Sequence, residues 1–73
     1  MRAELIKALK SHAQGHIDKH IAIVEVQLQK ATGVAEHSDH IETVEKELKI
    51  IAEYDDQLQM LDKYFTKKDP FKS

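Results

Sequence analysis

A break in the helical pattern near the middle of the chain constrains its fold more than any other feature. Two long stretches with apolar residues three and four positions apart flank residues 32–39, a segment that contains Gly33 and ends in Ser38 and Asp39. Glycine readily takes the left-handed conformation that ends a helix, and serine or aspartate accepts hydrogen bonds from the free amides of the next one. The sequence therefore predicts two helices joined by a short turn, which favours antiparallel neighbours.

The expected architecture is an all-α, antiparallel two-helix hairpin that forms a single domain over residues 1–73. Its parts are a helix at about 2–31, a turn at 32–38, a second helix at about 39–66 and a tail at 67–73. A chain of this length buries little apolar surface by itself, and it has no cysteine with which to form a disulfide. We therefore expect two hairpins to pair into a four-helix bundle, as a homodimer or a higher homo-oligomer.

Mostly apolar residues define the face that each helix is expected to turn toward the other. With the turn centred near Ala35, the register sets Ile51 near His20. Gly15 lies inside the first helix, which either continues through it or is kinked there. The first face comprises Leu5, Leu9, Ala13, Ile17, Ile21, Val24, Leu28 and Ala31, and the second comprises Ile41, Val44, Leu48, Ile51, Asp55, Leu58, Asp62 and Phe65.

Asp55 interrupts the apolar face of the second helix, and the expected register sets it opposite His16. A carboxylate in such a position is costly unless it is paired. These two residues are therefore predicted to form a polar core layer, which would fix the alignment of the helices at some cost in stability. An exposed pair is the alternative.

His12, His16 and His20 follow one another at intervals of four on one face of the first helix. Two histidines one turn apart can bind a transition-metal ion, but the third lies too far along the helix axis to share it. One alternative is therefore a metal-binding or pH-responsive bundle that uses His16, His20 and Asp55. The interpretation that we favour gives these rings carboxylate or water partners and requires no cofactor.

The charges are unevenly divided, although the whole chain carries only -2. Residues 1–31 hold five basic and three acidic side chains, for a net +2, whereas residues 38–66 hold three basic and eight acidic ones, for a net -5. This division suits an antiparallel pair, and equally two ordinary solvated faces. The low net charge argues against nucleic acid as the partner, so a small nucleic-acid-binding regulator is the least favoured alternative. No apolar run approaches the about 20 residues that span a membrane, and we expect a cytoplasmic protein.

Further apolar and aromatic residues form a candidate surface for a partner or for oligomer formation. Most of them gather near the open end of the predicted hairpin, where they suit contact with another protein, with a second copy or with the end of the bundle. They are Tyr54, Met60, Leu61, Tyr64 and Phe65 of the second helix, with Ile6 and Ile23 of the first.

Short motifs along residues 12–65 form a family-like pattern: HAQGHI at 12–17, KH at 19–20, VEV at 24–26, Gly33, EHSD at 36–39, IAEYDDQL at 51–58 and KYF at 63–65. Together they resemble a set of small uncharacterised proteins of large tailed bacteriophages, including cyanophages. The resemblance implies a viral accessory or structural protein in an infected bacterial cytoplasm. The expected function is a non-enzymatic, oligomeric helical interaction module that binds further copies of itself and a phage or host protein.

Overall fold

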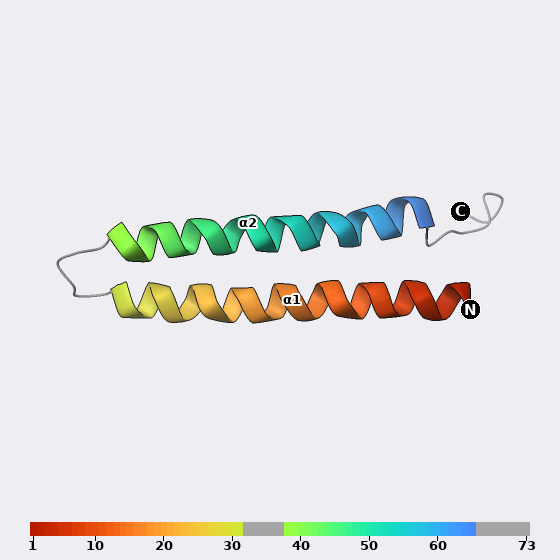
Figure 1. The fold of residues 1–73 in the computed structure, drawn as a ribbon, viewed down its shortest axis with the longest axis horizontal. Coiled ribbons are helices and arrows are strands. Elements are labelled where there is room, and N and C mark those ends of the chain that lie inside the picture. The colour runs from red at the N-terminus through yellow and green to blue at the C-terminus, as the bar shows by residue number, and fades with distance from the viewer. Residues whose placement is uncertain (32–37, 66–73) are drawn as a thin grey trace.

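The computed structural model describes residues 1–31 and 38–65, and it places them in two long helices that run antiparallel, side by side (Figure 1). Helix α1 spans Arg2–Ala31. Helix α2 spans Ser38–Met60 and continues into one π-helical turn, η1, at Leu61–Phe65. No strand occurs in these described ranges, which confirms the predicted all-α helical hairpin. Apart from Ser38, the predicted turn and tail lie outside the described residues.

Helix α1 is unbroken through Gly15, so the kinked alternative is wrong. This glycine faces away from α2, and a methyl group built on it would meet nothing within 4 Å. Gly15 therefore provides no close approach between the two helices. Its effect is local, because glycine lacks the helix propensity of alanine.

The interface between the helices follows a heptad repeat, with partly or fully buried positions alternately three and four residues apart. Of the described side chains, only Ala13 and Ile17 are buried, with 1% and 7% of their surfaces exposed. We call these alternating positions the seam: Ile6, Lys10, Ala13, Ile17, His20, Val24 and Gln27 of α1, and His40, Val44, Glu47, Ile51, Tyr54, Leu58 and Leu61 of α2.

The predicted faces were therefore wrong at about half of their positions. The predicted face of α1 contains four successive intervals of four residues from Leu5. Because four residues turn about 40° more than a full circle, a line of such residues moves gradually around the helix and away from the interface. On α2, the prediction chose the residues immediately after His40 and Glu47. The side chain of Ala31 lies outside the description, and the expected interface residues that are exposed instead are Leu5, Leu9, Ile21, Leu28, Ile41, Leu48, Asp55, Asp62 and Phe65.

The register also differs from the prediction, by about one helical turn. His20 pairs with Glu47 rather than lying at the level of Ile51. Next to the turn, Nδ1 of His40 donates to Oε1 of Gln27 at 2.8 Å. These two polar contacts align α1 with α2.

Candidate functional site

Three histidines of α1 and one tyrosine of α2 form a ladder of rings along one side of the seam. The rings of His16 and Tyr54 are stacked, with centroids 4.5 Å apart and planes only 6° apart. His12 meets the edge of His16 at 4.5 Å, and His20 continues the stack at 6.0 Å. The spacing of four predicted that the histidines share a face, but it gave no sign of Tyr54 as their partner.

The predicted layer of His16 and Asp55 does not form. Asp55 is exposed, and its Oδ2 accepts a hydrogen bond from Nε2 of Gln59 at 2.9 Å, one turn along the same helix. The polar layer instead joins His20 to Glu47, whose side chains are only 12% and 14% exposed. Sequence reasoning missed this layer because the predicted face of the second helix includes Leu48, the apolar neighbour of Glu47.

His16 occupies an unfavourable place for a charged ring. Its Nδ1 is buried without a hydrogen-bond partner. Burial lowers the pKa of His16 below its ordinary value, and the nearby positive charges of His12, Lys19 and His20 lower it further. The neutral ring is therefore favoured, which suits its stacking on Tyr54.

No metal site is apparent in residues 1–31 and 38–65, where no group of three or more His, Cys, Asp or Glu side chains is placed to hold an ion. The set proposed from the sequence requires Asp55 beside His16 and His20. Asp55 bonds within its own helix instead, and the stacking partner of His16 is Tyr54. The histidine ladder is therefore an element of packing in this structure.

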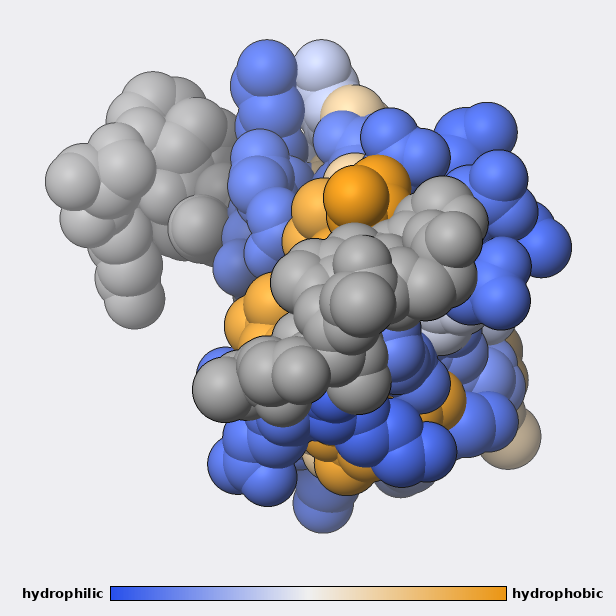
Figure 2. Space-filling view, turned by 90° about the vertical axis from the view of Figure 1, so that its left-hand side faces the viewer, coloured by the Kyte–Doolittle hydropathy of each residue, from blue (hydrophilic) through white to orange (hydrophobic). Residues whose placement is uncertain are grey.

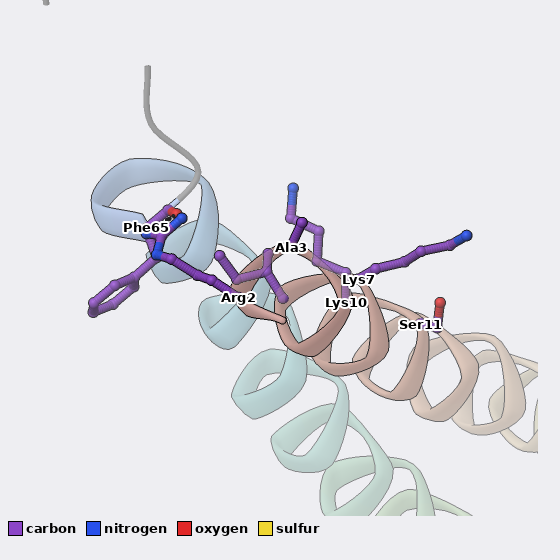
Figure 3. A pocket seen from close by; sticks show the side chains of 7 residues that line it. Arg2, Ala3, Lys7, Lys10, Ser11 and Phe65 are labelled. Carbon is purple, nitrogen blue, oxygen red and sulfur yellow. Dashed lines mark hydrogen bonds between the residues drawn. The ribbon is translucent and has the colours of Figure 1, made fainter. Parts of the chain in front are cut away.

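A shallow depression lies at the open end of the hairpin, where the start of α1 meets η1 (Figure 3). Nη2 of Arg2 donates to the carbonyl oxygen of Phe65 at 2.6 Å, and Lys10 pairs with Asp62 at 2.8 Å. The contact with Phe65 places the charge of Arg2 at the C-terminal, negative end of the helical segment, where a cation is stabilising. The sequence shows basic residues near the N-terminus, but only the antiparallel packing brings them to this helix end. The depression is lined by Arg2, Ala3, Ile6, Lys7, Lys10, Ser11 and Phe65.

The predicted partner surface is divided between two environments. Ile6, Ile23, Tyr54 and Leu61 are partly buried along the hairpin interface, and only part of each side chain remains accessible. The other three residues, all near the open end, stay exposed: Met60 by 42%, Tyr64 by 58% and Phe65 by 50%.

Five large apolar side chains along the turn-side half of the hairpin are exposed, by between 44% and 58%, and all of them except Val26 lie on one side of it. We call Ile21, Leu28, Ile41 and Leu48 the apolar quartet. Seen from the turn end, apolar surface lies open to solvent between the hydrophilic side chains (Figure 2). The sequence identified all four residues as interface positions, but the hairpin does not cover them.

No family model, curated protein or solved structure matches this chain. No helix in the described part of the chain combines the length and apolar character needed to cross a lipid bilayer.

Proposed function

We propose that the protein is a self-associating helical interaction module with a non-enzymatic, structural role. The observation that carries the proposal is the exposure of the apolar quartet in a hairpin where only two of the described side chains are buried. Full burial of a leucine or isoleucine stabilises by about 1.5–3 kcal/mol. Four such residues, each about half exposed, leave a large part of that stabilisation to be gained by association.

The pattern of the helices supports the same proposal. Helices that face a bundle core carry apolar residues at two seam positions and at one flanking position of each heptad. The quartet supplies that flanking position on both helices in the half near the turn. A lone hairpin needs only the two seam positions.

Sedimentation equilibrium of the full chain over a wide concentration range tests this proposal. We expect a reversible assembly of defined size, with dimer as the smallest species above the monomer. A chain that remains a folded monomer at the highest concentration would contradict self-association.

The viral accessory role implied by the sequence resemblance is a second part of this proposal. It predicts that the assembled module binds a phage or host protein. Tagged protein expressed during infection should retain that partner through stringent washing. A variant with a disrupted apolar quartet would show whether the binding depends on self-association.

A further inference from the structure

The apolar quartet lies on one side of the hairpin, and both helices contribute to it. Ile21 and Leu28 each follow a seam residue of α1 by four positions. Ile41 and Leu48 each precede a seam residue of α2 by three positions, which points them to the same side in an antiparallel pair. In the histidine ladder, His20 and Tyr54 belong to the seam, and His12 and His16 lie on its opposite side. The two features are therefore independent.

The same side becomes polar toward the open end, with opposite charges on the two helices. The heptad position that the apolar quartet occupies near the turn is held here by Lys7 and Gln14 on α1, and by Asp55 and Asp62 on α2. The contact of Lys10 with Asp62 places that aspartate on this side. One continuous face thus has an apolar half near the turn. In its other half, near the termini, the basic side chain belongs to α1 and the acidic side chains belong to α2.

We propose that a second copy of the chain docks on this face, with both turns at the same end and α1 of each copy lying on α2 of the other. The inference rests on the proposed self-association and specifies its interface. A two-fold axis along the hairpin then brings quartet onto quartet. It also sets Lys7 of each copy beside Asp62 of the other, so the face is complementary to itself.

The distribution of charge favours this orientation over the opposite one. Helix α1 carries five basic and three acidic residues, whereas residues 38–65 carry three basic and eight acidic ones, a net +2 against -5. With the turns at opposite ends, the two-fold axis would place acidic α2 on acidic α2. With the turns at the same end, each acidic helix lies on the mildly basic one.

Three lysine substitutions test the face. Ile21→Lys and Leu48→Lys place charges inside the proposed interface, whereas Val26→Lys is a matched control. Val26 is 50% exposed, like Leu48 at 52%, but lies about 140° around α1 from Ile21. Because each substitution occurs twice in a two-fold interface, we expect the first two to weaken dimerisation by about a hundredfold. Val26→Lys should retain the wild-type dissociation constant.

The possible outcomes separate the two proposals. A wild-type monomer at all concentrations would contradict self-association itself. A wild-type dimer that Ile21→Lys and Leu48→Lys leave intact would contradict only the assignment of this face. Circular dichroism of each variant establishes whether loss of the dimer accompanies loss of the helices.

Cross-linking tests the orientation without altering the quartet. The chain has no cysteine, so engineered thiols react without background. Gln14→Cys and Asp55→Cys are prepared separately and mixed. We expect a disulfide-linked dimer from the mixture and none from either variant alone. A cross-link formed by one variant alone, or no cross-link in a dimeric mixture, would overturn the proposed arrangement.

Discussion

The ring of His16 is buried at Nδ1, stacked on Tyr54 and close to three basic side chains. Its pKa is lowered in the folded protein, first by burial and then by these charges. The unfolded chain therefore takes up the proton at a higher pH than the folded one. The free energy of unfolding therefore decreases as pH falls from the ordinary histidine pKa of about 6.5 toward the lowered pKa of His16 in the folded protein. Chemical denaturation between about pH 7.5 and pH 5.5 should show this loss.

His16→Phe provides the control, because phenylalanine keeps the stacking on Tyr54 and cannot be protonated. We expect the variant to lose less stability than the wild type over the same pH range. In a proton NMR titration, the wild-type protein should show a resonance of His16 with a midpoint below the ordinary histidine value, and the variant should lack it. Equal losses in both proteins would show that His16 is not responsible.

Glu47 and His20 form the polar layer that sets the register, and both side chains are largely shielded from water. Glu47→Leu leaves the histidine without its acceptor, and His20→Leu leaves the carboxylate without its donor. Each single variant should lose about 1–3 kcal/mol of stability. The double variant should recover most of this loss or exceed the wild type, since apolar replacement of a buried pair is often neutral or stabilising. Urea denaturation of the wild type, the two single variants and the double variant measures the coupling energy between the two side chains. If the losses of the single variants simply add in the double variant, the two residues are not coupled.

At the scale of the helix, Gly15 is the position where α1 is weakest, with open space around it. Gly15→Ala should therefore raise the free energy of unfolding by about 1 kcal/mol. Gln29→Ala is the control, because this exposed residue occupies the equivalent outward heptad position and should change stability by only about 0.3 kcal/mol. Thermal melts at one concentration compare them. A destabilised Gly15→Ala protein would mean that another chain closely approaches the outer face.

The two elements were predictable to a larger extent than their contacts. Helix α1 has the predicted bounds of 2–31, and α2 begins at Ser38, within one residue of the prediction. Helical stretches and caps are local signals, readable in a single chain. The seam depends on which polar residues find partners across it, and Glu47 enters only because His20 faces it. A prediction that favours apolar residues chooses Leu48 instead, although the two positions are adjacent.

Adjacent positions such as Glu47 and Leu48 face different surfaces of the whole molecule. In the hairpin, the seam uses one residue of each pair, such as Glu47, and exposes the other, such as Leu48. In a four-helix bundle both positions are covered, one by the hairpin and the other by the second copy. Under the proposed pairing, the apolar stripes predicted from the sequence contain residues of two interfaces, of which the hairpin forms one.

Stability should accordingly depend on protein concentration. Among the described side chains the hairpin buries only Ala13 and Ile17, and in the proposed assembly the second copy supplies much of the remaining stabilisation. Mass action then raises the thermal midpoint as concentration increases over about a hundredfold range. Val26→Lys should follow the wild-type dependence, whereas Ile21→Lys should melt at a lower midpoint that varies less with concentration. If the wild-type midpoint is independent of concentration while the chain is folded, the seam alone stabilises the hairpin, because a monomeric transition involves no association.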